Sequence, residues 1–115
     1  MSPVADVLIL CKDLMLSSQI HGAVQRAGRR GRTCLSISGC LQQLNAAPVS
    51  YLIVDLETPE LDPVQLKEAI GPECRIIGYA PHVREELFEA AQAAGWDAAL
   101  TRGQAVRKIE TILSR

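Results

Sequence analysis

Short apolar runs alternate along the chain with segments of helical periodicity. Continuous apolar runs bounded by polar turns are typical of buried parallel strands, and apolar positions three and four residues apart are typical of helices. On these patterns we predict strands at 7–10, 51–54, 75–79 and 98–100, and the alternation of residues 33–37 predicts a further strand nearer the sheet edge. We predict helices at 17–27, through Leu41 and Leu44, at 62–70, at 85–94 and at 104–113.

Cap residues mark the starts of two of these helices. Ser17 or Ser18 is suited to cap the first helix, and Asp62, followed by Pro63, is suited to cap the third. Five strand–helix pairs with short connections predict one α/β domain spanning 1–115, without an output domain. Right-handed crossovers favour a flavodoxin-like (βα)5 three-layer sandwich, with its parallel five-stranded sheet in the order 2-1-3-4-5.

Composition excludes several classes of protein. Apolar residues make up 48% of the chain and the net charge is −1, so disorder and a nucleic-acid-coating role are not expected. The cysteines lack C-x-x-C or cysteine–histidine spacing, which indicates reduced thiols rather than disulfides or zinc ligands: Cys11, Cys34, Cys40 and Cys74. Residues 1–6 lack a signal-peptide pattern and no apolar run has membrane-spanning length, so we expect a cytoplasmic protein without a membrane partner.

One carboxylate stands where a sheet of this kind places its site. Asp55 ends the most apolar run of the chain, at 51–54, and Pro59 follows four residues later. Open α/β sheets bind ligands at the carboxyl ends of their strands. Asp55 is therefore the first candidate for a functional residue.

The chain resembles a response-regulator receiver domain of the CheY-like type nearly from end to end. The resemblance rests on the runs at 7–10 and 52–55, the spacing of Asp55 to Pro59, and the alanine-glycine segment at 93–102. It implies two-component phosphorelay signal transduction, with Asp55 matching the phosphoacceptor. The family also uses two acidic Mg²⁺ ligands after the first strand, a hydroxyl after the fourth, and an aromatic residue and a lysine on the fifth.

The sequence departs from the family at nearly all of these supporting positions. Other residue types take their places: Cys11 and Lys12 for the acidic pair, Ala80 for the hydroxyl, Ala99 for the aromatic residue, and Arg102, after Thr101, for the lysine. Asp13 lies one position after the family's acidic pair, and Glu57 adds negative charge at the rim of the pocket around Asp55. An ammonium group and a thiol are unsuitable as ligands for Mg²⁺, which requires oxygen ligands. We therefore expect a degenerate pseudo-receiver that binds no Mg²⁺ and no other cofactor.

Two interpretations of the charges around Asp55 stay open. In the first, Lys12, with or without Arg102, replaces the metal as a fixed cation and forms an ion pair with Asp55. In the second, Lys12 extends into water and Asp55 is solvated.

Cys11 supports an alternative function as a nucleophile. The segment 11–18 resembles the cysteine loop of sugar-phosphotransferase IIB domains, which would make the chain a phosphocysteine carrier. Leu14 replaces that family's glycine, however, and Leu16 takes the place of a small hydroxyl residue. A buried, inert thiol is the competing interpretation.

The preferred function is a stand-alone, non-enzymatic signalling module that acts through protein–protein contacts. The resemblance places its binding face on the fourth helix, fifth strand and fifth helix, a stretch that includes Glu86, Glu89, Gln92, Arg107 and Lys108. A conventional receiver that is phosphorylated on Asp55 is the alternative. A basic cluster could bind an acidic partner or a nucleic-acid backbone, or could be a solvated loop balanced by acids: Arg26, Arg29, Arg30 and Arg32. The oligomeric state is left open.

Overall fold

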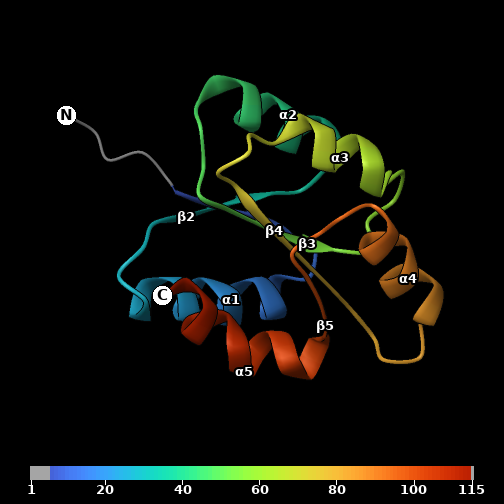
Figure 1. Cartoon of the computed structure of the whole chain (residues 1–115). Helices are drawn as coiled ribbons and strands as arrows, with labels where there is room; N and C mark the ends of the chain where they lie inside the picture. The colour runs from blue at the N-terminus through green and yellow to red at the C-terminus, as the bar shows by residue number, and fades with distance from the viewer. Residues whose placement is uncertain (1–5, 115) are drawn as a thin grey trace.

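The computed structural model describes residues 6–114 and contains one five-stranded parallel sheet (Figure 1). The strands lie in the order β2-β1-β3-β4-β5, which confirms the predicted flavodoxin-like (βα)5 topology. Their bounds are β1 (Val7–Leu10), β2 (Gly31–Cys34), β3 (Tyr51–Asp55), β4 (Arg75–Ala80) and β5 (Ala98–Thr101). The helices are α1 (Leu14–Arg26), α2 (Ile37–Ala46), α3 (Pro63–Ala69), α4 (Glu85–Ala93) and α5 (Arg102–Leu113).

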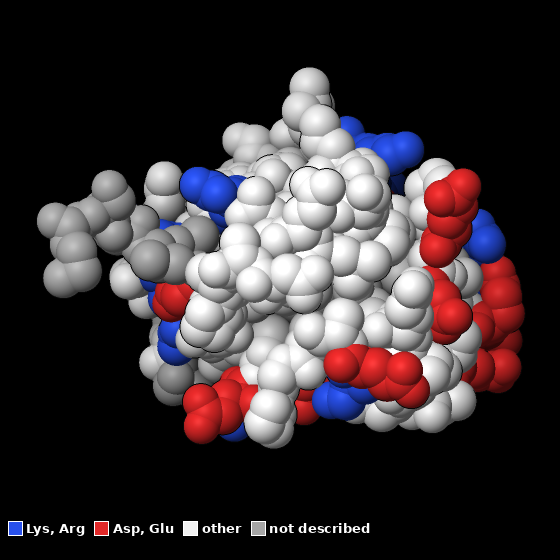
Figure 2. Space-filling model, turned by 90° about the horizontal axis from the view of Figure 1, so that it is seen from above, with Lys and Arg blue, Asp and Glu red and all other residues white. Residues whose placement is uncertain are grey.

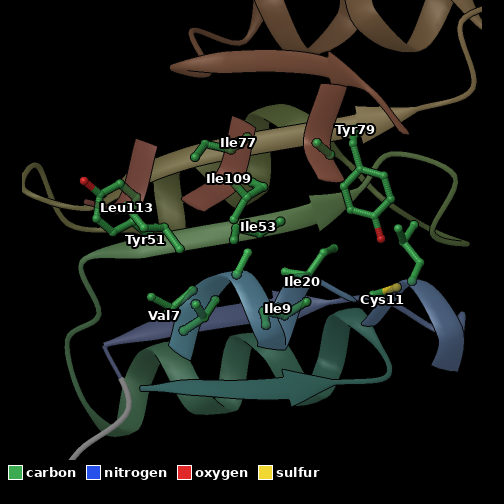
Figure 3. Packing of buried hydrophobic residues seen from close by; sticks show 14 residues of the cluster. Val7, Ile9, Cys11, Ile20, Tyr51, Ile53, Ile77, Tyr79, Ile109 and Leu113 are labelled. Atoms are coloured by element: carbon green, nitrogen blue, oxygen red, sulfur yellow. The ribbon is translucent and has the colours of Figure 1, made fainter. Parts of the chain in front are cut away.

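Two helical layers cover the sheet. Helices α1 and α5 pack together on one face, and α2, α3 and α4 cover the other (Figure 1). Side chains alternate between the faces along each strand, so Val7 and Ile9 join the α1–α5 core while Leu8 and Leu10 join the opposite one. Figure 3 shows the first of these clusters. Both faces of the sheet are therefore buried, as the continuous apolar runs predict.

Helix α1 begins three residues before its predicted start. Asp13 caps it, because one carboxylate oxygen accepts hydrogen bonds from the N–H groups of Met15 and Leu16, at 3.0 and 3.1 Å. The prediction of a cap at Ser17 or Ser18 was wrong. Ser17 is instead buried inside the helix, where its hydroxyl lies 3.3 Å from the hydroxyl of Thr33.

Capping also corrects two other boundaries. Strand β2 covers 31–34 rather than 33–37, because Ser36 turns the chain and caps α2 through a 3.1 Å bond from the N–H of Gly39. Helix α5 begins at Arg102 rather than at 104, since Thr101 and Gln104 form a capping box. The predicted cap of α3 by Asp62 is confirmed.

The α4 side of the core is closed by a tight contact over β4. A Cβ atom at Gly78 would lie 2.8 Å from side-chain atoms of both Leu56 and Trp96. Trp96 is buried, and its indole N–H donates to the carbonyl oxygen of Pro63 at 3.0 Å. Glycine is therefore required at position 78 by lack of space.

Two residues of the arginine cluster tie the ends of the first and last helices together. Arg29 pairs with Asp6 at 2.9 Å and donates to the carbonyl oxygen of Leu113 at 2.6 Å. Arg26 pairs with Glu110 across α1 and α5. These contacts agree with the interpretation in which nearby acids balance the arginines.

Residues 1–5, on which the expectation of no signal peptide mainly rests, lie outside the described residues. Among the helices that are described, none has the length and apolar character needed to cross a membrane.

Candidate functional site

The predicted pocket residues lie at the carboxyl edge of the sheet. Because parallel strands end at the same edge, the loops that follow them meet there. The residues come from four strand–helix connections: Cys11, Lys12 and Asp13 after β1, Asp55 and Glu57 at the end of β3, Ala80 at the end of β4, and Thr101 and Arg102 between β5 and α5.

Asp55 is half-buried and is held by its own loop. One carboxylate oxygen accepts the N–H of Glu57 at 2.9 Å, and the carbonyl oxygen of Asp55 accepts the N–H of Thr58 at 3.0 Å. Burial raises the pKa of Asp55, while the Glu57 N–H and the positive charge of Arg102 act in the opposite direction. The loop therefore orients the carboxylate, but ionisation carries a cost of desolvation.

The first of the two interpretations placed Lys12 or Arg102 in an ion pair with Asp55, and the ion pairs within residues 6–114 do not include it. Arg102 instead donates to Asp13 at 3.0 Å. Asp13 is available for this pair because only one of its two oxygens caps α1. The N–H of Leu16 is the main cause that lowers the pKa of Asp13, and Arg102 adds to it. Lys12 is exposed, as in the solvated interpretation.

A second ion pair on the rim was not predicted from the sequence. Arg84, just before α4, pairs with Glu57 at 2.8 Å and with Glu86 at 2.6 Å. Glu86 is two residues away, so that contact could have been proposed from local sequence. Glu57 lies 27 positions earlier, and no local pattern links the two residues. The pair joins the loop after β3 to the loop after β4.

Cys11 faces the interior. Its side chain is 1% exposed, and its sulfur donates to the carbonyl oxygen of Asp13 at 3.4 Å. Figure 3 shows Cys11 at the same end of the core cluster as Tyr79, whose hydroxyl points toward it. This position agrees with the interpretation of Cys11 as a buried thiol.

Tyr79 is a buried polar residue that the sequence analysis missed. It lies opposite Asp55 in the β3–β4 register and is 0% exposed. Its hydroxyl has no hydrogen-bond partner in the part of the chain that the structure describes. Burial is the main cause that raises the pKa of Tyr79 above its ordinary value, and the neighbouring Cys11 thiol raises it further. The apolar run of β4 gave no sign that one of its core residues would leave a hydroxyl unpaired.

The potential metal ligands at this edge are few and are engaged by other groups. Between residues 6 and 114 there is no group of three or more histidine, cysteine, aspartate or glutamate side chains arranged to hold a metal. Asp13 is occupied by the α1 cap and by Arg102, and the Cys11 thiol points inward. Asp55 alone would have to supply the carboxylate oxygens that Mg²⁺ prefers.

Solved structures with the same fold are receiver domains. A response regulator protein from Burkholderia pseudomallei, solved with a phosphorylated aspartic acid, a calcium ion and citrate, aligns with a TM-score of 0.78 and 18% identity, over 96% of this chain and 66% of that chain. A CheY-like receiver domain protein from Methanospirillum hungatei aligns with a TM-score of 0.76 and 16% identity, over 96% of this chain and 94% of that chain. The chemotaxis response regulator CheY4 of Vibrio cholerae aligns with a TM-score of 0.75 and 16% identity, over 96% of this chain and 99% of that chain.

No family model matches the sequence, and no curated protein matches it either. The structural likeness at these low identities concerns the fold. The chain has the fold of CheY-like response-regulator receiver domains, as the sequence resemblance predicted.

Proposed function

We propose that the chain is a receiver-like signalling module that acts through protein contacts and does not accept a phosphoryl group on Asp55 by the Mg²⁺-dependent route. The observation that carries this proposal is the use of Asp13. It is the acid nearest to the family's metal-binding pair, and it is already engaged by the α1 cap and by Arg102. Without a metal, the group that mainly neutralises the charge on a transferring phosphoryl group is missing.

The other supporting groups of phosphoryl transfer are also missing or occupied. Ala80 ends β4 without a hydroxyl, and Arg102, at the family's lysine position, is paired. The ion pairs Asp13–Arg102 and Glu57–Arg84 link neighbouring loops around Asp55. A module built in this way would keep one arrangement of its loops, and its signal would depend on whether a partner is present.

The proposed partner surface is formed by α4, β5 and α5. Its charged and amide side chains are exposed: Glu86, Glu89 and Gln92 on α4, and Arg107 and Lys108 on α5. Acids lie on one helix and bases on the other, so a protein partner with the reverse arrangement would fit this surface.

An amide NMR titration tests the first part of the proposal. The chain is titrated with Mg²⁺ and then with beryllofluoride, a phosphoryl mimic, and Asp55→Asn serves as the matched control. We expect no saturable shifts up to millimolar Mg²⁺ in either protein. Saturable shifts at Asp55, Asp13 and Arg102 in the wild type, absent from the control, would refute the proposal.

The same titration addresses the alternative, a conventional receiver. The observation that favours this alternative is Asp55 itself, which is partly exposed and uses only one of its two side-chain oxygens in hydrogen bonds with the described residues. The Burkholderia response regulator, which carries a phosphorylated aspartic acid, has the same fold. A phosphocysteine carrier has less support, since Cys11 is buried and a carrier thiol must be accessible.

A further inference from the structure

Helix α2 and its flanks form the uncharged surface of the molecule. From Thr33 to Val54 the sequence contains no charged residue, whereas each of the other helices in the described part of the chain has at least one. Figure 2 shows this face, with a broad area free of lysine, arginine, aspartate and glutamate and with charges around its margin. The surface therefore differs in kind from the other helical faces.

This surface exposes apolar and amide side chains. Leu35, before α2, is 59% exposed, and Val64, on the neighbouring helix α3, is 53% exposed. Gln42 and Asn45 are exposed on α2 and make no side-chain hydrogen bond to the described residues, whereas Gln43 accepts from the exposed guanidinium of Arg32 at 2.9 Å, which brings one charge to α2. Each amide has both donors and acceptors, so it can pair with an identical amide.

A cleft of about 530 Å³ continues the surface at the C-terminal end of α2. It lies between that end and the connection from α3 to β4. Apolar side chains form much of its wall, among them Leu44, Val49, Ile70 and Pro72, and Glu73 is the charged residue in its lining. The uncharged surface thus contains a depression that could receive side chains from another molecule.

The charge distribution over the helices indicates which kind of molecule the α2 surface would bind. In a two-fold symmetric contact the same patch faces itself, so a patch with one sign of charge opposes like charges. Helix α4 exposes Glu85, Glu86 and Glu89, and α5 exposes Arg107 and Lys108. An uncharged face with self-complementary amides avoids this repulsion. We propose that the α2 face binds a second copy of this chain and forms a symmetric dimer.

The dimer would be weak and would leave the proposed partner surface free. Helix α2 has 10 residues and is therefore about 15 Å long, which is short for a standard interface of about 800 Å² per partner. Strand β2, beside α2, and strand β5 lie at opposite edges of the sheet. The self-association does not depend on the proposed function, because it uses a different surface and none of the residues around Asp55.

Sedimentation velocity of the full chain, from about 10 μM to about 1 mM, tests the proposal over the range expected for a weak interface. We expect the average mass of the wild type to rise toward twice the monomer mass. Gln42→Glu places like charges in the contact and should keep the chain monomeric throughout. Gln92→Glu makes the same change on α4 and should behave as the wild type does.

Several results would overturn this inference. The wild type could stay monomeric over the whole range, or Gln42→Glu could associate as strongly as the wild type. A monomer whose α2 surface becomes protected only when a different protein is added would also contradict it. Circular dichroism checks that Gln42→Glu is folded, and Asn45→Asp is the second variant, on the same exposed surface, should the first not fold.

Discussion

Replacement of Tyr79 by phenylalanine should make the protein more stable. The side chain is 0% exposed, and its hydroxyl has no partner among the described residues. A buried polar group without a hydrogen bond costs about 1–3 kcal/mol, which Tyr79→Phe removes. The lost oxygen, of roughly 15 Å³, leaves a void that costs roughly 0.4 kcal/mol at about 24 cal/mol per Å³. The expected net gain in the free energy of unfolding is therefore about 0.6–2.6 kcal/mol.

Chemical and thermal denaturation followed by circular dichroism measure this gain. For a domain of this size, 1 kcal/mol raises the melting temperature by roughly 4 °C. Tyr51→Phe is the matched control, because the Tyr51 hydroxyl does have an acceptor, the carbonyl oxygen of Ile112 at 3.5 Å. This second variant should be neutral or slightly less stable than the wild type. A loss of about 1 kcal/mol or more in Tyr79→Phe would refute the reasoning and would mean that the hydroxyl has a partner in solution.

The same substitution should change the stability of the protein in alkali. Burial raises the pKa of Tyr79 above its ordinary value of 10.0, so the folded phenol stays protonated where the unfolded one ionises. Above that pH the unfolded state binds fewer protons, and wild-type stability falls by up to about 1.4 kcal/mol per pH unit from this residue. The stability difference between Tyr79→Phe and the wild type should therefore widen between about pH 9 and about pH 11. An unchanged difference would show that Tyr79 is not desolvated.

Three further predictions concern the site and the core. Asp55→Asn should raise the denaturation midpoint at pH 7, because burial raises the pKa of Asp55 and the substitution removes the cost of burying its charge. This gain in stability should vanish below the ordinary pKa of 3.8, where the carboxyl group is protonated in both the folded and the unfolded state. A loss of stability at pH 7 would instead point to a cation beside Asp55. Cys11 should react slowly with iodoacetamide in the native protein, and reaction as fast as in a denatured sample would revive the phosphocysteine alternative. Gly78→Ala should cost about 1–3 kcal/mol by forcing Leu56 and Trp96 apart, whereas Gly71→Ala, with open space around it, should cost less.

The sheet was predictable because its signals are local. The central strands β1, β3 and β4 consist largely of continuous apolar runs, as burial of both sheet faces requires, whereas the edge strand β2, Gly31–Cys34, is polar and its bounds were predicted less well. Strand order followed from the handedness of the crossovers. Helix starts were less predictable. Ser17 and Asp13 are both acceptable caps by residue type, and no local pattern decides between them. The second carboxylate oxygen of Asp13 pairs with Arg102, which is 89 positions away in the sequence. Because this partner is so distant, the sequence left open whether a cation pairs with Asp55.

Residue types located the candidate site, but pairing decided its electrostatics. Asp55, Asp13, Glu57 and Arg102 were all predicted to lie near one another, and their strand ends do meet at one edge. The acid with which each arginine forms an ion pair depends on how far the two side chains extend across the loops. Arg84 was missed for this reason, since its partner Glu57 belongs to another strand–helix connection.

The fold does not require the charge of Asp55. An asparagine at this position could accept the N–H of Glu57 through its side-chain oxygen, as Asp55 does at 2.9 Å, without the cost of burying an ionised group. Asp13, in contrast, uses its charge toward Arg102. A stability gain in Asp55→Asn at pH 7, together with no response to Mg²⁺, would mean that the carboxylate is neither a structural ion-pair member nor a metal ligand. Contact with a partner would then be the remaining role for its charge, which connects this residue to the proposed function.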